Sequence, residues 1–331
     1  MKKISNEELR QAVQTLGLLV RRNYPLSDAV KALGQDREPW VEVGKHVAEG
    51  DELGPAMRRY PQIFSPFFSG MVEAAERSHN AEAILTTLST WLETADRMRR
   101  KVQEVLYYPI LLISFLLMEL GLLLGFGLGS TVLPLKYVNE GPLSSDLGSA
   151  IQLGSIVCFI LAAIVLFGSW RVETLLPLAL KIPAFRALVQ RADQAIWARA
   201  LAAFLQAGTP LPDALERCQS VPWSKELRVE LEKLALRIKK GDTLSKALSE
   251  TDILDPQLRW AVTAGEAKED LSATLLYSAE QLERGLMERC EAFMLILQPL
   301  TVLLVGAMTA ALLAPFWWSF YHYSWNLGLP V

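Results

Sequence analysis

The sequence predicts an all-α membrane protein in which one helical unit, each time running into a membrane segment, occurs twice. Turn residues and apolar spacing in Leu16 to Val30 recur in Leu201 to Leu215. Hydrophobic residues make up 51% of the 331 residues and gather in long apolar runs. Helix start and stop signals recur along the chain, and no segment has a convincing strand pattern. We therefore expect two homologous cytoplasmic six-helix bundles and three transmembrane helices.

The repeat continues beyond this first similarity, through turns, caps and a proline inside an apolar run. Duplication of this kind rules out an interpretation as one enzyme with one cleft. The matching positions are Gly50-Asp51 with Gly241-Asp242, Ser65-Pro66 with Asp255-Pro256, Ala75-Glu76 with Gly265-Glu266, and Pro109 with Pro299.

Tight turns between short helices are expected near the start of each unit. Pro25 and Pro210 are predicted at the first position of a helix, where the missing N–H costs nothing. Gly208 precedes Pro210 as a chain-reversing residue. Gly50 and Gly241 are each able to take positive φ, and each is followed by an aspartate that we expect to cap the next helix.

The last helix of each unit, from about Glu82 and about Ser272, reaches its apolar run without a turn signal. A continuous helix transmits displacement stiffly, whereas a flexible linker does not. Pro109 and Pro299 lie a few residues inside the two runs, where each removes one helical hydrogen bond. The sequence therefore predicts two corresponding kinks.

Three apolar runs are long enough to cross a bilayer at 1.5 Å per residue. Basic residues gather at one end of each run, for example in Arg97 to Lys101 before the first. By the positive-inside rule, the N-terminus and both bundles are cytoplasmic and the C-terminus is on the opposite side. The expected organisation is residues 1–104 for the first bundle, 105–133, 151–170 and 292–318 for the spans, 134–150 for a periplasmic loop, 171–291 for the second bundle and 319–331 for a periplasmic tail.

Glu119 stands inside the first apolar run, where a carboxylate is unfavourable unless it faces protein or water. Gly121, Gly125 and Gly129 follow at intervals of one helical turn and predict a stripe where another helix approaches closely. Two interpretations of Glu119 stay open. It contacts a partner or handles protons within the membrane, or it makes a helix–helix hydrogen bond or lies near an interface.

Glu76 and Glu266 occupy equivalent positions of the two repeats. Duplicated acids of this kind are either salt-bridged caps inside each bundle or a docking face for a cytoplasmic partner.

Catalytic and cofactor sites are not indicated by the sequence. The net charge is -3 without a polybasic stretch, so no nucleic-acid partner is expected. The three cysteines are far apart, and the histidines are scattered, which argues against a metal site. Gly44-Lys45 lacks the other residues of a phosphate-binding loop. We expect a protein that is not an enzyme and that holds no cofactor or metal.

Several of these motifs resemble those of the type II secretion system F domain family. They are the hairpin from Gly208 to Leu215 and its weaker counterpart from Asn23 to Val30, the glycine turns, the repeated acids, and the prolines at the start of two spans. The resemblance covers nearly the whole chain. It implies a multi-pass platform protein of the bacterial inner membrane, in a type II secretion or type IV pilus assembly machine.

The same resemblance implies partners. A cytoplasmic hexameric assembly ATPase would supply energy, and pilin or pseudopilin membrane helices would be moved into a fibre. Other inner-membrane assembly proteins and a homo-oligomer are also expected. The alternatives are a small helical transporter or a membrane-bound enzyme. Transporter repeats usually duplicate the spans themselves, whereas most of each repeat here is soluble.

Overall fold

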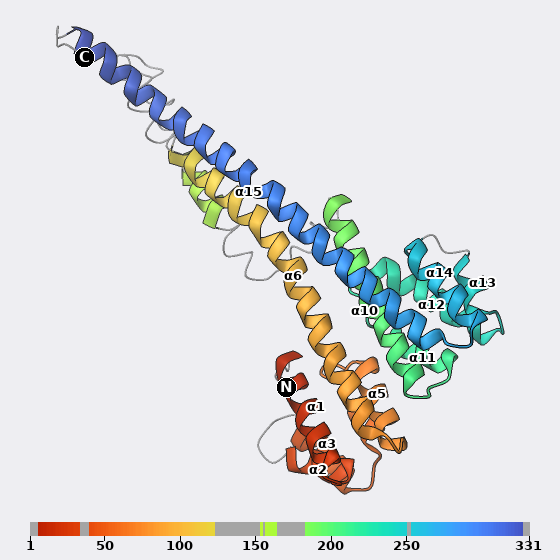
Figure 1. Ribbon diagram of the computed structural model, residues 1–331. Helices are drawn as coiled ribbons and strands as arrows, with labels where there is room; N and C mark the ends of the chain where they lie inside the picture. Colours follow the sequence, from red (N-terminus) through yellow and green to blue (C-terminus); the bar gives the residue numbers. More distant parts are fainter. Residues whose placement is uncertain are drawn as a thin grey trace. The chain divides into compact units, whose positions relative to one another are not determined.

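The computed structural model describes residues 6–33, 40–122, 153–154, 156–163, 183–249 and 253–326. Within these ranges all regular secondary structure is helical (Figure 1). The two repeats expected from the sequence give two series of helices in the same order. We describe them in turn.

The first repeat places five short helices before a long one. Their bounds are α1 Asn6–Arg21, α2 Leu26–Leu33, α3 Trp40–Ala48, α4 Leu53–Arg58, α5 Pro66–Arg77 and α6 Ala81–Leu122.

The second repeat has the same pattern, so that α1 corresponds to α10, α2 to α11 and so on to α6 and α15. Its helices are α10 Pro183–Gln206, α11 Leu211–Cys218, α12 Lys225–Lys239, α13 Leu244–Ser249, α14 Pro256–Ala267 and α15 Leu271–Asn326.

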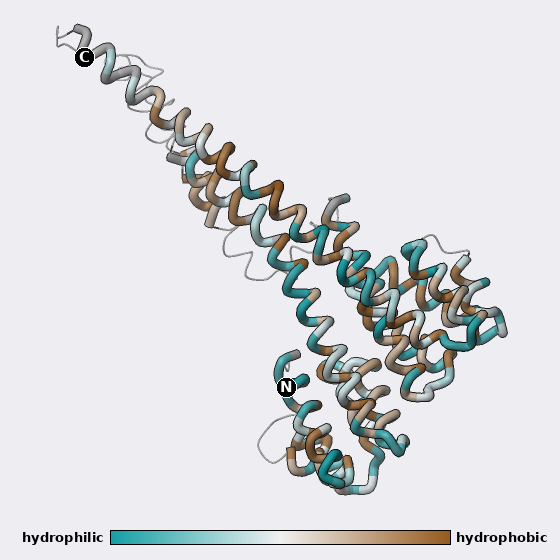
Figure 2. The backbone as a smooth tube through the Cα atoms, in the orientation of Figure 1, coloured by the Kyte–Doolittle hydropathy of each residue, from teal (hydrophilic) through white to brown (hydrophobic). Residues whose placement is uncertain are grey.

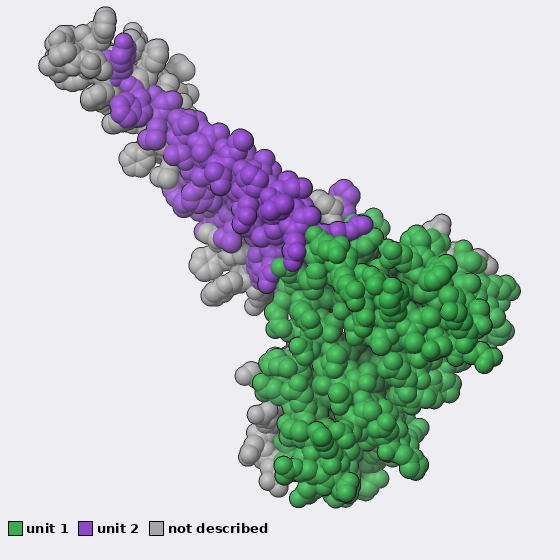
Figure 3. Space-filling view, viewed as in Figure 1, with its two compact units in different colours: residues 1–101, 186–288 green, residues 102–185, 289–331 purple. Residues whose placement is uncertain are grey.

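The chain forms two compact units, coloured separately in Figure 3. Unit 1 comprises Met1–Lys101 and Arg186–Glu288, and unit 2 comprises Val102–Phe185 and Arg289–Val331. The short helices of both repeats therefore belong to one unit, although the predicted membrane segments separate them in the sequence. Helices α6 and α15 each contribute residues to both units.

The predicted turns contain residues with positive φ. Asn23 and Gly208 have φ of 63° and 78°, and Gly50 and Gly241 have φ of 103° and 95°. A Cβ at any of these three glycines would meet nothing within 4 Å, so their backbone conformation, rather than a lack of space, favours glycine. Pro25 and Pro210 lie directly before α2 and α11, one residue earlier than predicted.

Proline does occupy the first helical position in α5 and α14. Ser65 caps α5 through a hydrogen bond that its hydroxyl accepts from the Phe68 N–H. Asp255 caps α14 in a similar way, accepting from the Gln257 N–H at 3.0 Å. These caps satisfy N–H groups that have no partner within the helix.

The core of unit 1 includes the part of α10 from Ala192 to Phe204, in which every residue is buried or half-buried. A helix that is apolar all round packs on every side, whereas a surface helix is apolar on one stripe. Its counterpart α1 is of the second kind, with Leu18 62% exposed. The residues of α10 exposed by 3% or less include Ala192, Ala195, Ile196, Trp197, Ala198, Ala200, Leu201, Ala202, Ala203 and Phe204.

Two described helices are long and apolar enough to cross a membrane, within Ala81–Gly121 and Leu271–Ala311. Figure 2 shows that their unit 2 portions are largely hydrophobic. In the part of α15 that belongs to unit 2, apolar side chains are exposed, for example Leu295 by 73% and Val302 by 75%. Apolar surface of this extent is unfavourable in water and suits a lipid environment.

Parts of the predicted organisation lie outside the described residues. The loop 134–150 is one of them, as is most of the span 151–170, of which only 153–154 and 156–163 are described, as helix. Helix α15 continues to Asn326, into the segment that we expected to be a tail.

Gly265 provides a test of the packing between α14 and α15. A Cβ here would lie 2.9 Å from the Leu271 Cα, a backbone atom, and closer still to the Thr274 hydroxyl. Because the backbone cannot turn aside as a flexible side chain can, Gly265→Ala should lower the free energy of unfolding by about 1–3 kcal/mol. Thermal unfolding of the full chain in detergent would measure this loss.

Gly17→Ala in α1 is the matched control. Its Cβ would meet the Leu85 Cβ at 3.9 Å, an ordinary contact, and alanine favours a helix over glycine. Equal losses of melting temperature in the two variants would contradict the proposed close approach.

Candidate functional site

The two repeats are joined in unit 1 through a buried carboxylate on α5. Helix α5 of the first repeat packs against α11 of the second. Glu73 on α5 is only 5% exposed. It accepts a hydrogen bond at 2.9 Å from Arg217 on α11 and another from Arg58 on α4, and Arg77 lies 3.2 Å away. One acid therefore holds arginines from both repeats.

The charge of Glu73 depends on these arginines. Burial by itself favours the neutral acid, but the hydrogen bonds from Arg217 and Arg58 outweigh it and lower the pKa of Glu73 below its usual value. The carboxylate is therefore ionised at neutral pH. A buried charge is tolerated only when it is paired in this way.

Gly70 allows Arg217 to reach this carboxylate. A Cβ at Gly70 would lie 2.7 Å from Arg217 Nη1 and 3.0 Å from the Phe204 ring. Around it, the Phe67 and Phe204 rings meet edge to face with centroids 5.3 Å apart. Trp91 on α6 donates a hydrogen bond to the Ile196 carbonyl of α10 at 3.2 Å. The junction thus combines aromatic packing with a buried ion pair.

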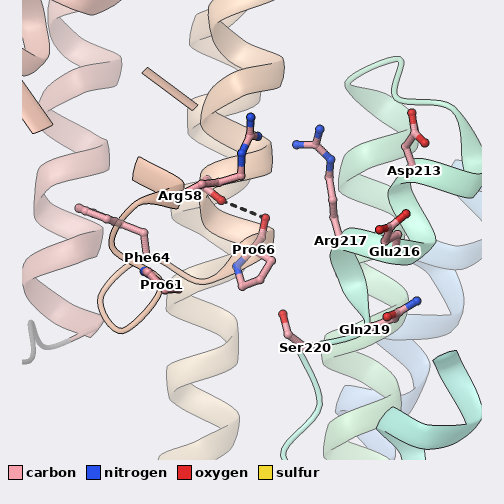
Figure 4. Close-up of a pocket in the computed structure, with 10 residues that line it drawn as sticks. Arg58, Pro61, Phe64, Pro66, Asp213, Glu216, Arg217, Gln219 and Ser220 are labelled. Atoms are coloured by element: carbon pink, nitrogen blue, oxygen red, sulfur yellow. Dashed lines mark hydrogen bonds between the residues drawn. The ribbon is translucent and has the colours of Figure 1, made fainter. Parts of the chain in front are cut away.

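Two cavities lie beside the junction. One of about 720 Å³ has Arg58 and Pro66 on one side and Arg217 and Glu216 on the other (Figure 4). A second, of about 520 Å³, is lined by residues that include Glu73, Gly208 and Arg217. Both are lined by groups of both charges, which suits a polar segment of a partner better than an apolar small molecule.

In unit 2 the acid of the first predicted span is hydrogen-bonded to the other long helix. Glu119 on α6 is 6% exposed, and its Oε1 accepts from the Thr309 hydroxyl of α15 at 2.9 Å. Its Oε2 is buried without a hydrogen-bond partner among the residues that the structure describes. The helix–helix hydrogen bond that we expected as one interpretation of Glu119 is present. Its Oε2 could accept a hydrogen bond from a further donor.

Glu119 and Thr309 are equivalent positions of the two repeats, because they follow Pro109 and Pro299 at the same distance in the sequence. Near the prolines, the Tyr108 hydroxyl contacts the Thr301 hydroxyl at 2.5 Å. Polar contacts therefore join α6 and α15 at two levels of unit 2.

The other predicted intramembrane residues are only partly described. Gly121 is buried on α6, whereas Gly125 and Gly129 lie outside the described residues. Both α6 and α15 are helical through their prolines, Pro109 and Pro299. The glycine stripe and the kinks stay predictions.

The repeated acids Glu76 and Glu266 bind backbone groups within their own repeats. Glu76 accepts from the N–H groups of Leu53, at 2.9 and 3.0 Å, and of Gly54, at 3.4 Å. Glu266 accepts from Leu244 and Ser245 at 2.6 and 3.0 Å. Each carboxylate therefore caps the N-terminus of α4 or α13, where a negative charge is favourable. A role in docking a partner remains a hypothesis.

These contacts correct one prediction. We expected Asp51 and Asp242 to cap the helices that follow them. Instead Asp51 pairs with Arg59 at 2.7 Å and Asp242 with Lys246 at 2.9 Å. The distant glutamates approach the N–H groups from a neighbouring helix, which leaves the aspartates free to form surface ion pairs.

Sequence reasoning missed Glu73, Arg217 and Asp193. Asp193 is fully buried on α10 and accepts from the N–H groups of Trp223 and Ser224 at 2.7 and 2.9 Å. Burial raises the pKa of Asp193, against the effect of these hydrogen bonds. A charged residue within an alanine-rich helix was the available signal for Asp193. Glu73 carried none, because its partner Arg217 is 144 residues away.

The fold and these contacts define a class: a duplicated all-α protein whose two repeats share one compact unit and whose long apolar helices fit a membrane. The model of the family described as type II secretion system (T2SS), protein F, matches the chain twice, at residues 12–129 and 197–316. Together these matches cover more than half of the chain. The chain belongs to this family.

Proteins of known role resemble the chain over most of its length. It is 23% identical to the type II secretion system protein F of Vibrio cholerae, over 92% of this chain and 80% of that protein. It is 22% identical to the type IV pilus assembly protein PilC of Pseudomonas aeruginosa, over 94% of this chain and 88% of that protein. A PilC protein of Thermus thermophilus is 24% identical, over 84% of this chain and 71% of that protein.

Glu73→Gln tests the ion pair that joins the repeats. The variant leaves Arg217 and Arg58 without an anion, so the free energy of unfolding near pH 7 should fall by about 1–3 kcal/mol, between the values for exposed and fully buried pairs. Because the pKa of Glu73 is lowered in the folded state, the wild-type advantage is complete above its ordinary value of 4.5. It should disappear as the pH falls through the lower folded-state value.

Unfolding of the full chain in detergent at several pH values would measure this dependence. Glu230→Gln is the matched control, because Glu230 forms only a surface pair with Lys233 at 2.7 Å and should change stability by less than about 0.5 kcal/mol. A difference between wild type and Glu73→Gln that persists unchanged at low pH would contradict this assignment.

Proposed function

We propose that this protein is an inner-membrane platform of a type II secretion or type IV pilus assembly machine. Membership of the family carries the proposal, together with the names of the relatives, which are secretion and pilus assembly proteins. The platform would couple a cytoplasmic hexameric assembly ATPase to the movement of pilin or pseudopilin helices into a fibre. A transporter or a membrane-bound enzyme has no comparable support.

The proposed organisation keeps both bundles on the cytoplasmic side of the membrane. Each repeat would be a six-helix bundle, and spans at 105–133, 151–170 and 292–318 would leave the C-terminus in the periplasm. Positive residues beside the spans support this orientation. The chain would then be a multi-pass protein of the bacterial inner membrane, and two spans between the bundles return the chain to the same side.

Force transmission is supported by two features. The bundles share one compact unit, joined by Glu73 and Arg217. Helices α6 and α15 each continue from this unit into unit 2 as one α-helix. A displacement of unit 1 by the ATPase would therefore reach the membrane helices through helices and not through flexible linkers.

Photo-crosslinking tests the link to the ATPase. A photoreactive residue would replace Lys45 on α3 or its counterpart in the second repeat, Leu236 on α12, both of which are exposed. We expect at least one of these positions to trap the co-encoded ATPase in cells. The control is Ile160, which is 53% exposed but lies in a predicted span and should not trap it.

A platform lacking any ATPase crosslink from unit 1, in cells that still assemble fibres, would argue against direct coupling. Reporter fusions that place the two bundles on opposite faces of the membrane would refute the proposed organisation altogether.

Glu119 is proposed to contact a subunit helix within the membrane. The observation behind this is its buried Oε2, which has no hydrogen-bond partner in the described part of the chain, whereas Oε1 is bound by Thr309. Glu119→Gln should therefore reduce fibre assembly or secretion by about tenfold or more at normal protein level, because a carboxyl group that recognises a donor is lost. Assembly would be measured in a deletion strain that expresses the variant.

Thr309→Val is the matched variant, since it removes the hydrogen bond to Oε1 and leaves the acid in place. If Glu119 serves a subunit, assembly should survive Thr309→Val better than Glu119→Gln. Equal assembly defects, each with a loss of thermal stability, would instead make the pair a structural contact between α6 and α15.

A further inference from the structure

The two repeats use different faces to bind each other within unit 1. The first repeat contributes α5 and α6, through Phe67, Glu73 and Trp91. The second contributes α10 and α11, through Phe204 and Arg217. The packing is therefore head to tail, because a two-fold arrangement would use the same face on both repeats. Each repeat therefore also has a counterpart of the face that the other repeat uses, and this counterpart takes no part in the junction.

The first of these remaining faces lies on α14. Helices α5 and α14 both begin at a proline after a capping residue, so Phe67, Gly70 and Glu73 correspond to Gln257, Trp260 and Thr263. The three residues on α5 are buried, whereas all three on α14 are exposed, Trp260 by 72%. We call Gln257, Trp260 and Thr263 the α14 face.

The second remaining face lies on α1 and α2. Ile196, Ala200 and Ala203 on α10 are 2%, 0% and 3% exposed. Their counterparts on α1, namely Gln11, Thr15 and Leu18, are all exposed, Leu18 by 62%. Ala32 on α2, the counterpart of Arg217, is exposed too. We call Gln11, Thr15, Leu18 and Ala32 the α1–α2 face.

The two open faces fit each other in size at the position where the internal junction is tightest. In that junction the small residue Gly70 is on α5, and the large residue Arg217 reaches across it. In the open faces the sizes are exchanged, because Trp260 replaces the glycine and Ala32 replaces the arginine. One large side chain would therefore again pack against one small residue, with the large residue now on the other face. The two charged residues of the internal junction both have uncharged counterparts in the open faces, because Thr263 is the counterpart of Glu73 and Ala32 is the counterpart of Arg217.

We infer that a second copy of this chain docks its α1–α2 face on the α14 face, in the same head-to-tail manner as the two repeats within one chain. Trp260 then lies over Ala32 of the neighbouring copy and beside its Leu19, the half-buried counterpart of Phe204. Repetition of this contact gives a ring if the rotation closes, or an open array if it does not. The inference concerns self-association alone, so it does not depend on the platform role.

Disulfide crosslinking between two differently tagged full-length copies tests the contact in membranes. One copy carries Trp260→Cys and the other Ala32→Cys, each together with Cys158→Ser, because Cys158 is partly exposed whereas the native Cys218 and Cys290 are buried. We expect a linked product with both tags, at a yield at least tenfold above that of two Trp260→Cys copies or two Ala32→Cys copies. A control pairs Ala32→Cys with Val229→Cys, which is 50% exposed on α12.

No product above the control pair would overturn the inference. A product formed equally well between two Trp260→Cys copies would overturn it too, because it would indicate a two-fold contact. So would a link from Trp260→Cys to a different protein in place of a second copy.

A size exchange provides an independent test. Ala32→Arg places two large groups against each other and should reduce the crosslink between a second pair, Leu19→Cys and Gln257→Cys, by at least fivefold. These two positions are the counterparts of Phe204 and Phe67, whose ring centroids lie 5.3 Å apart. Adding Trp260→Gly recreates the glycine and arginine of the internal junction and should restore most of the yield. Ala32 and Trp260 are both exposed, so the fold should tolerate the changes, which circular dichroism would verify. A yield that Ala32→Arg leaves unchanged, or that Trp260→Gly fails to restore, would contradict the contact.

Discussion

The ion pair between Glu73 and Arg217 is the contact on which unit 1 depends. A buried carboxylate must be paired, and here Arg217 of the second repeat adds to the pairing that Arg58 of the first repeat provides. Gly70 makes this possible, because any larger residue would occupy the space of the arginine. The apolar burial of α10 follows from the same association, since the first repeat covers a side of α10 that is open on α1.

Duplication has produced two different relations between the repeats. In unit 1, α5 of one repeat binds α10 and α11 of the other, which are not its counterparts. In unit 2, counterpart positions meet, because Glu119 of α6 is bonded to Thr309 of α15. Equivalent positions of the two repeats therefore have different environments. The difference between Gly70 and its counterpart Trp260 reflects those environments. A protein built in this way has faces that its own repeats leave open.

Each bundle is also stabilised locally by a feature that both repeats share. Glu76 and Glu266 cap a short helix from across the bundle, and the helices that they cap begin directly after a glycine turn. Short helices gain little from their own hydrogen bonds, so a remote carboxylate at the N-terminus fixes their position and direction. The repeated acids therefore have a structural role within each bundle, whether or not a partner also binds them.

The sequence by itself determined the duplication, the helical class, the family and the glycine turns, because each of these is a local pattern of residue types at short spacing. It also singled out Glu119, since a carboxylate within an apolar run is costly wherever the run lies. It did not determine that Thr309 would bind this acid, that Glu73 would pair with Arg217, or that glutamates rather than the adjacent aspartates would cap α4 and α13. Only the tertiary structure decided these contacts, because a hydrogen bond between residues far apart in the chain depends on how helices pack and leaves no periodic trace in the sequence.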